Sequence, residues 1–254
     1  MTVIPVNRDD IRIGLAEVGL RPGDVVFVHS SLSAFGHVEG GADAVIDALL
    51  ESVGASGTVA VPTFTWGNFH DQDAVVFDVA ATPCEVGRIP EVFRRRPGAV
   101  RSHHVCHSVA AIGPRALELM GEGVRSFGEG STFDALYRLD SWCLLLGVTF
   151  GVCTALHSVE ERMQVPYRYY RYFHGSTVIL PGGREVASRS VEFLRRDGYE
   201  NCFEKMGGVF EEAGILRTAV VGKATLTNAR IRDIVDTAGK LVAADPYFLV
   251  GDDG

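Results

Sequence analysis

Residues 24–64, DVVFVHSSLSAFGHVEGGADAVIDALLESVGASGTVAVPTF, decide the fold. They begin with DVVFVHS (24–30), a β-branched run that is typical of a buried strand. The stretch 40–54 then places apolar residues at helical spacing and ends in glycine. A second apolar run, GTVAVPTF (57–64), follows directly. This strand–helix–strand order predicts two parallel strands in a sheet that helices cover.

The same alternation continues outward along the chain. We expect further helices over 7–17, 87–95, 153–163, 202–214 and 229–242 and from Pro114, and further strands over 108–113, 142–148, 176–181 and 216–222. Residues 65–83 have no strong periodicity and predict a long surface loop. Neither an internal repeat nor a low-complexity linker interrupts the pattern. Residues 1–254 therefore predict a single three-layer α/β/α domain with a central mixed sheet.

Composition limits the compartment and the partners. The formal net charge of −8 opposes nucleic-acid binding, because the main electrostatic contribution would be repulsive. No apolar run reaches the length of about 18 residues that a membrane span needs, and charges near the N-terminus are unlike a secretory signal. The five cysteines are odd in number and contain no CxxC pair, which suits a reducing compartment. We expect a cytoplasmic protein without nucleic-acid or membrane partners.

The loop HSSLSAFGHVEGG (29–41) follows the first strand of this unit and leads into its helix. Ligands of open α/β sheets bind at this edge. Small hydroxyl and glycine residues let backbone N–H groups approach a phosphate, and the helix dipole favours an anion there. A hydroxyl-rich turn with a helix cap explains the same composition, so both interpretations stay open.

The segment RSHHVCHS (101–108) gathers histidines before a strand. Imidazole clusters bind zinc, but His103 and His104 are adjacent and would face opposite sides of a strand. No spaced carboxylate or cysteine set nearby completes a metal shell, so we expect no metal. Arg101 beside Ser102 is suited to a phosphate or a carboxylate, although a polar strand entrance is the simpler alternative.

The segment LHSVEER (156–162) places His157 and Glu160 three positions apart on one helical face. A histidine held by a carboxylate has a fixed tautomer and raised basicity, as a general base requires. Surface helices also carry such pairs by chance. The GxSxG, GxGxxG and P-loop patterns are absent, which argues against serine hydrolases, dinucleotide enzymes and P-loop enzymes.

Taken together, these segments resemble the aminoglycoside 3-N-acetyltransferase family. The resemblance runs from about residue 25 to residue 161, and a weaker match follows in the last forty residues. It rests on five motifs in this order: HSSLSAFGHVEGG, PTFTW, FDVAATPCEVGRIPEVFRRRPGAVRSHHVCHSVAAIG, FGEGSTFDALYRLDSWCLLLGV and TALHSVEE. It implies an acetyl-CoA cosubstrate and a small-molecule amine acceptor, and a homodimer is one possible assembly. One departure is Val105, where the family's RS-x-HP segment usually has proline.

The resemblance also implies roles for individual residues. His157 and Glu160 match the catalytic histidine and its carboxylate partner. His104 matches the histidine of the RS-x-HP segment and is expected to contact the acceptor. The remaining matches are expected near CoA: Ser30, Ser31, Leu32, Ser33, Val38, Arg101 and Ser102.

The acceptor side departs from what a polycationic aminoglycoside requires. The region after the catalytic helix contains Arg168, Arg171, Arg195 and Arg196 rather than a run of acidic residues. Arginines in the cleft favour a neutral or anionic acceptor, with Arg168 and Arg171 as expected contacts. If they face solvent or pair with neighbouring carboxylates, an ordinary aminoglycoside remains the acceptor.

The expected reaction is direct acetyl transfer with His157 as the general base. A covalent route through Cys106 is a rival, because thiols attack thioesters readily and Cys106 lies beside His104 and His107. A CoA-binding module that has lost catalysis is a second rival, against which the intact His157–Glu160 pair argues.

Overall fold

The strand–helix–strand unit forms as the sequence predicts. In the computed structural model, which describes residues 5–70 and 74–252, β1 (Val25–Ser30) and β2 (Thr58–Pro62) pair in parallel, and α2 (Gly41–Val53) connects them. Seven strands of this described part form one sheet in the order β12-β13-β6-β1-β2-β5-β4. The added strands are β4 (Val100–Arg101), β5 (Val109–Ile112), β6 (Trp142–Leu146), β12 (Arg217–Val221) and β13 (Ala224–Arg230). β6 pairs in parallel with β1 but antiparallel with β13, so the sheet is mixed, as expected.

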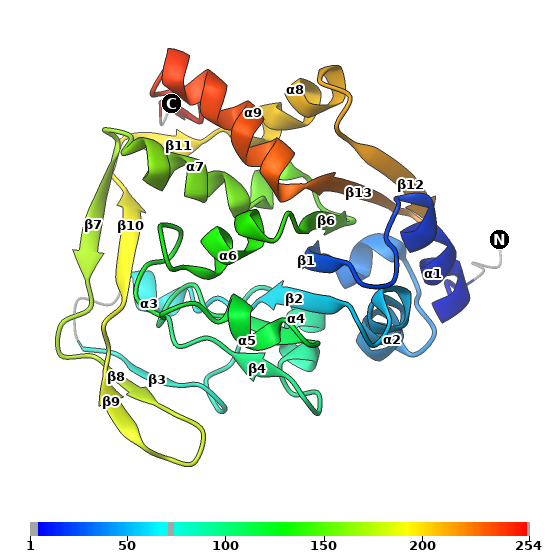
Figure 1. Cartoon of the computed structure of the whole chain (residues 1–254), viewed down its shortest axis with the longest axis horizontal. Helices are drawn as coiled ribbons and strands as arrows, with labels where there is room; N and C mark the ends of the chain where they lie inside the picture. Colours follow the sequence, from blue (N-terminus) through cyan, green and yellow to red (C-terminus); the bar gives the residue numbers. More distant parts are fainter. Residues whose placement is uncertain (1–4, 71–73, 253–254) are drawn as a thin grey trace.

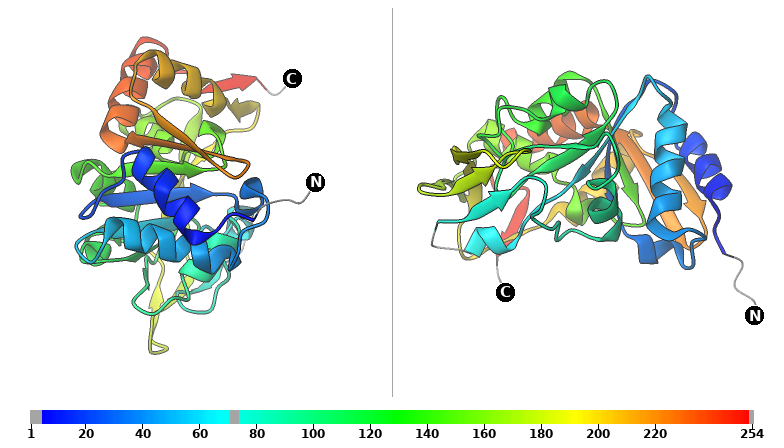
Figure 2. Two further views of the ribbon diagram at one scale, coloured as in Figure 1. Left: turned by 90° about the vertical axis from the view of Figure 1, so that its right-hand side faces the viewer. Right: turned by 90° about the horizontal axis from the view of Figure 1, so that it is seen from below.

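Helices cover both faces of this sheet. Along β1, Val26 and Val28 face one core, which α1 (Arg8–Glu17), α2 and α4 (Arg88–Phe93) complete. Phe27 faces the other, because neighbouring side chains of a strand point to opposite sides. That second core is completed by α5 (Ala116–Leu119), α6 (Thr132–Arg138), α7 (Ala155–Met163), α8 (Met206–Glu212) and α9 (Ile231–Ala244). Figure 2 shows α1 and α2 on the opposite side of the sheet from α9, so the three layers predicted from sequence are confirmed.

The helix ends follow local chemistry. α1 begins in a capping box, in which the Asn7 side chain accepts the N–H groups of Asp9 and Asp10 while the Asp10 carboxylate accepts the Asn7 N–H. α2 ends at Gly54, whose φ of 63° suits glycine. Across residues 5–70 and 74–252, no helix is both long and apolar enough to span a bilayer.

A set of small sheets lies at one end of the molecule, and the strand expected over 176–181 is the one member of it that was predicted. β7 (Arg168–Tyr172) pairs with β10 (Val191–Arg195), β11 (Tyr199–Asn201) pairs with β14 (Val250–Asp252), and β8 (Thr177–Ile179) lies between β3 (Val76–Asp78) and β9 (Glu185–Ala187). β3 and α3 (Gly67–His70) lie in the region expected to be a loop. Figure 1 shows β7, β10 and the β8–β9 hairpin beyond the end of the sheet that lies away from α1.

Candidate active site

A cavity of about 530 Å³ opens at the carboxyl ends of β1, β2 and β6. Loops after parallel strands converge at this edge, which is where open α/β sheets bind their ligands. The lining combines aromatic and aliphatic side chains with about as many polar ones, and convergent polar groups in a concave site suit a small-molecule ligand. The polar side chains that matter most for the chemistry are His29, Ser30, His107, His157 and Asn201.

His157 and Glu160 meet at this cavity. The His157 Nδ1 atom lies 2.5 Å from Glu160 Oε2, so the contact predicted from their spacing on α7 is confirmed. Glu160 is fully buried and is held from two further sides. Its Oε1 accepts a hydrogen bond of 2.8 Å from the Tyr167 hydroxyl, and Arg168 Nε lies 2.8 Å from its Oε2 as an ion pair.

The surroundings fix the charges of this pair. Burial lowers the pKa of His157, as does the charge of Arg168, while Glu160 opposes both. Burial favours the neutral form of Glu160, but the charge and hydrogen bond of His157, then Arg168 and Tyr167, outweigh it and lower the pKa of Glu160. The carboxylate is therefore ionised and the imidazole neutral near neutral pH.

The same contacts set the tautomer of His157. Nδ1 lies closer to Glu160 Oε2, at 2.5 Å, than to Arg168 Nη2, at 3.1 Å, and Nη2 has the Asn201 side-chain oxygen as its acceptor at 3.0 Å. We therefore assign the proton to Nδ1, which leaves the lone pair on Nε2. The rings of Phe127 and Phe203 lie against the imidazole, with centroids 4.9 and 4.8 Å away.

Three hollows join into one path through this site. A groove of about 590 Å³ along the loop after β1 shares Ser30 and Val86 with the first cavity. A cleft of about 640 Å³ beside β7 and β10 shares Trp66, His107, His157 and Asn201 with it. His157 therefore lies where the cavity and the cleft meet, within reach of ligands that enter from either side.

The serine loop lines the groove, as its sequence suggested. Ser30, Ser31, Leu32 and Ser33 all contribute to it, and the Ser31 and Ser33 hydroxyls lie 3.2 Å apart. Val38 does not lie with them. Its side chain is buried with the core of α1 and α2, away from the groove, so a contact of Val38 with CoA stays a prediction.

Arg101 and Ser102 are also buried rather than presented to a ligand. Arg101 donates to the Thr63 and Ser108 hydroxyls and to the carbonyls of Val79, Thr82 and Thr63, and its guanidinium stacks on a phenylalanine ring. The Ser102 hydroxyl accepts the N–H of Val109. Arg101 therefore joins β4 to the loop after β2, and Ser102, directly after β4, joins this end of the strand to β5; that either side chain contacts the cofactor stays a prediction.

His104 organises its own loop. Its Nδ1 accepts the N–H groups of Cys106 and His107, and its Nε2 lies 3.2 Å from the Val191 carbonyl. The next residue, Val105, donates its N–H to the Ser190 hydroxyl, a bond that the family's usual proline could not make. His104 is buried, and burial lowers its pKa to about 4. These contacts occupy both ring nitrogens of His104, and its contact with the acceptor stays a prediction.

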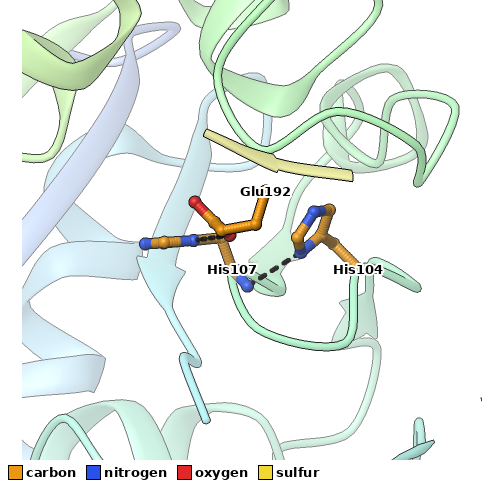
Figure 3. A group of neighbouring side chains, drawn as sticks. All are labelled: His104, His107 and Glu192. Carbon is orange, nitrogen blue, oxygen red and sulfur yellow. Dashed lines mark hydrogen bonds and ion pairs between the residues drawn. The ribbon is translucent and has the colours of Figure 1, made fainter. Parts of the chain in front are cut away.

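His104, His107 and Glu192 are the one group in the described part of the chain that has the composition of a metal site (Figure 3). Their ligand atoms lie within 4.8 Å of one another. The hydrogen bonds oppose metal binding, however, because Nδ1 of His104 accepts two backbone N–H groups and Nε2 faces a carbonyl oxygen. A metal ligand requires a nitrogen lone pair that is directed at the ion.

Sequence reasoning missed several residues of this site. His107 and Glu192 form a second histidine–carboxylate pair, with Nδ1 and Oε2 2.7 Å apart. His29 accepts the Thr154 N–H on Nε2, and burial, followed by the charge of His157, lowers its pKa to about 3. The position of His29 at the end of a predicted strand was the available signal, whereas nothing in the sequence links His107 to Glu192.

The four arginines have different surroundings. Arg168 is held by Glu160, Asn201 and the Phe193 carbonyl, so its charge lies directly beside the His157–Glu160 pair. Arg195 lies 3.3 Å from Glu200, and Arg196 bonds the Pro166 carbonyl and stacks on a tyrosine ring. Arg168, Arg171 and Arg195 line the cleft.

Cys106 is an unsuitable nucleophile. Its side chain is fully buried, and burial, followed by the charge of Glu192, raises the pKa of its thiol. The described residues that line the cavity and the cleft do not include it. The thiolate that a covalent route requires is therefore disfavoured.

The chain is similar to known proteins over most of its length. Residues 27–243 match the family model described as aminoglycoside 3-N-acetyltransferase. The chain belongs to this family, which confirms the resemblance seen in its motifs. It is 38% identical to aminoglycoside N(3)-acetyltransferase IX of Micromonospora chalcea over 79% of this chain and 76% of that protein. It is 31% identical to the aminoglycoside N(3')-acetyltransferase-like protein YokD of Bacillus subtilis, over 94% and 93% of the two chains.

Solved structures show the same relationship. The crystal structure of aminoglycoside acetyltransferase AAC(3)-Xa superimposes with a TM-score of 0.80 at 32% identity, covering 94% of this chain and 93% of that one. The structure of YokD gives a TM-score of 0.82 at 30% identity and covers 97% of each chain.

Proposed function

We propose that this protein transfers the acetyl group of acetyl-CoA to an amine of an aminoglycoside or a related small molecule. The observation that carries the proposal is the His157–Glu160 pair at the junction of the cavity and the cleft. Family membership supports it. Two further structures agree: a mutant of AAC(3)-IVa has been solved with apramycin at 27% identity, and AAC-IIIb, which shares the fold at 23% identity, has been solved with CoASH.

The donor enters along the serine groove. The hydroxyls of Ser30, Ser31 and Ser33 and the backbone of their loop bind the CoA chain, and the thioester reaches the first cavity beside His157. The acceptor occupies the cleft beside β7 and β10. Positioning both substrates in one path supplies much of the rate acceleration, because the reaction becomes effectively intramolecular.

His157 moves the proton. As the amine nitrogen bonds the thioester carbon, Nε2 accepts a proton from that nitrogen, and Glu160 stabilises the imidazolium. The carbon–sulfur bond then breaks, and the imidazolium returns its proton to the departing thiolate. Arg168 and Tyr167 hold Glu160 in place and take no part in proton transfer.

Replacing the base tests this proposal. His157→Ala should lower the rate of acetyl transfer on the order of 100- to 10,000-fold while leaving acetyl-CoA binding nearly intact. His37→Ala is the matched control, because His37 is exposed and absent from the described lining of the path. Initial rates with an amine panel and acetyl-CoA titrations measure both effects. Wild-type turnover in His157→Ala would overturn the proposed base.

We also expect the acceptor to be less cationic than a tetra-amine. Arg171 lines the cleft and, unlike Arg168, is not among the residues that hold Glu160, so its charge can be reversed without removing a partner of that carboxylate. Charge at contact distance matters most, because salt screens fields beyond about 8 Å. Arg171→Glu should therefore raise kcat/KM for highly charged aminoglycosides relative to simple amines.

Arg184→Glu is the control for this change, since it alters the net charge equally but lies at the exposed turn between β8 and β9. The measurement is kcat/KM across acceptors of graded charge. If tetra-amines are the best substrates of the wild-type protein, Arg171 does not govern acceptor charge and the aminoglycoside alternative holds.

A further inference from the structure

A second histidine–carboxylate pair faces the same reaction space as His157 and Glu160. His107, in the loop between β4 and β5, places Nδ1 2.7 Å from Oε2 of Glu192 on β10 (Figure 3). The Ser126 hydroxyl donates to Glu192 Oε1 at 3.0 Å. Only 1% of the Glu192 side chain is exposed, so the structure buries a second carboxylate whose oxygens both have partners.

The two imidazoles converge. Both rings lie against Phe127, with centroids 4.6 Å away for His107 and 4.9 Å away for His157. Both also line the cavity and the cleft. A molecule at the junction of these hollows is therefore within reach of two histidines, each oriented through Nδ1 by its own buried carboxylate.

Amine acetylation removes two protons from the acceptor nitrogen at different stages, so two bases can each accept one of them. Alkyl amines have a pKa of about 10, so an acceptor arrives as an ammonium ion with no lone pair for attack. In the complete reaction, R–NH3⁺ and acetyl-CoA give R–NH–acetyl, CoA thiol and H⁺. The nitrogen thus loses two protons, one before the carbon–nitrogen bond forms and one as or after it forms. The thiolate recovers one of them, and solvent receives the other.

We propose that His107, oriented by Glu192, is a second catalytic residue that takes the first proton from the acceptor ammonium. This assignment rests on the proposed function. His107 accepts the proton and leaves the neutral amine, His157 accepts the second proton as the nitrogen attacks and passes it to the thiolate, and His107 then releases its proton to solvent. No further reactant is needed.

The electrostatic surroundings suit this division. Burial disfavours ionised Glu192, but the charge and hydrogen bond of His107, the charge of His104 and the Ser126 hydroxyl outweigh it and lower the pKa of Glu192. The carboxylate stays charged and stabilises His107 when it is protonated. The charged and titratable groups that share the two hollows with His107, or pack on its loop, are Glu192, His157, His29, Arg168, Tyr169, Arg171, Arg195, Asp197, Glu85, His104 and Cys106.

The test compares two acceptors on the same enzyme preparation. One is a simple alkylamine, and the other is an amine of similar size whose pKa lies below neutrality, so that it is already unprotonated. At neutral pH, His107→Gln should lower the rate of acetyl transfer on the order of 100-fold with the first acceptor and change it little with the second. Its deficit with the alkylamine should shrink as pH rises towards the pKa of that amine. His157→Ala should instead lose activity with both acceptors at every pH.

The ratio of the two rates does not depend on the fraction of folded enzyme, so a destabilised variant still gives a valid result. His103→Gln, an exposed neighbour in the same loop, is the control and should keep the wild-type ratio. An equal loss by His107→Gln on both acceptors would mean that His107 only supports the structure. If the wild-type protein acetylates neither amine nor an aminoglycoside, the proposed function itself fails.

Discussion

At the residue scale, burial decides which charged groups are available to a ligand. Arg101 is 7% exposed, and burial, followed by the charge of Arg94, lowers its pKa to about 10. Its guanidinium donates to hydroxyls and carbonyls that are buried or partly buried. Hydrogen bonds to a charged group contribute more than neutral ones, so Arg101 is a structural tie between β4 and its surroundings.

Replacing Arg101 separates stability from cofactor binding. Arg101→Met should lower the free energy of unfolding by about 3 kcal/mol, because it removes the charged donor that the Val79, Thr82 and Thr63 carbonyls share in a mostly buried setting. Acetyl-CoA affinity should change little. Ser33→Ala, in the groove, should have the opposite effect: it should weaken the binding of acetyl-CoA and change the free energy of unfolding little. Urea unfolding and acetyl-CoA titration measure the two effects. A stable Arg101→Met protein with weak acetyl-CoA binding would restore Arg101 as a cofactor contact.

Of the two histidine–carboxylate pairs, only one could be predicted from the sequence. His157 and Glu160 were predictable as a pair because helical geometry brings positions three apart together. His107 and Glu192 are separated by 85 positions and meet only because β10 lies beside the loop before β5. Local spacing carries no information about such a contact. The burial of the Arg101 side chain could not be predicted either, because an arginine that binds a cofactor and an arginine that bonds buried backbone groups look the same in the sequence.

At the element scale, the serine groove depends on a close approach between two loops. Gly147 follows β6 with a φ of 65°, and its N–H donates to the Thr225 carbonyl. A Cβ atom built on Gly147 would lie 2.3 Å from the Cβ of Ala34, which belongs to the short helix η1 (Leu32–Phe35) beside the groove. The absence of a side chain thus allows η1 to sit against the loop after β6.

Substituting this glycine should damage the groove as well as the fold. Gly147→Ala adds backbone strain and a clash with η1, so we expect a loss of about 2–4 kcal/mol in the free energy of unfolding and a raised KM for acetyl-CoA. Gly183→Ala is the matched control. Gly183 has a φ of 83° but no neighbouring atom within 4 Å of its added Cβ, so it should lose only the smaller backbone contribution. Equal effects of both variants on KM would contradict the role assigned to this packing.

Elements with a strong apolar pattern were predictable, and most elements of the small sheets at the end of the molecule were not. The two strands of residues 24–64 are buried almost throughout and the helix between them buries one face, so continuous apolar runs and helical spacing identify them. β7, with the sequence RYYRY, alternates no apolar face and is partly exposed. It forms a strand because β10 pairs with it along five positions. Tertiary pairing of this kind overrides weak local preference.

At the scale of the whole molecule, buried histidines connect folding to pH. His29 and His104 are 5% and 3% exposed, and burial is the main cause that lowers their pKa values to about 3 and about 4. Both stay neutral in the folded protein at mildly acidic pH, whereas an unfolded histidine binds a proton below about pH 6.5. The unfolded state therefore holds more protons than the folded state in this window, so stability falls as pH falls.

The loss can be assigned to individual histidines. Each should cost about 2 kcal/mol between pH 7 and about pH 5, because folding then requires a proton to be released. His29→Gln removes one titrating group and keeps a side-chain oxygen that can accept the Thr154 N–H. Its unfolding free energy should therefore decline less steeply on acidification than that of the wild-type protein, whereas His37→Gln, at an exposed histidine, should follow the wild type. Urea unfolding at a series of pH values measures these slopes. Parallel slopes for His29→Gln and wild type would mean that His29 is already protonated in the folded protein, so that burial does not hold it neutral.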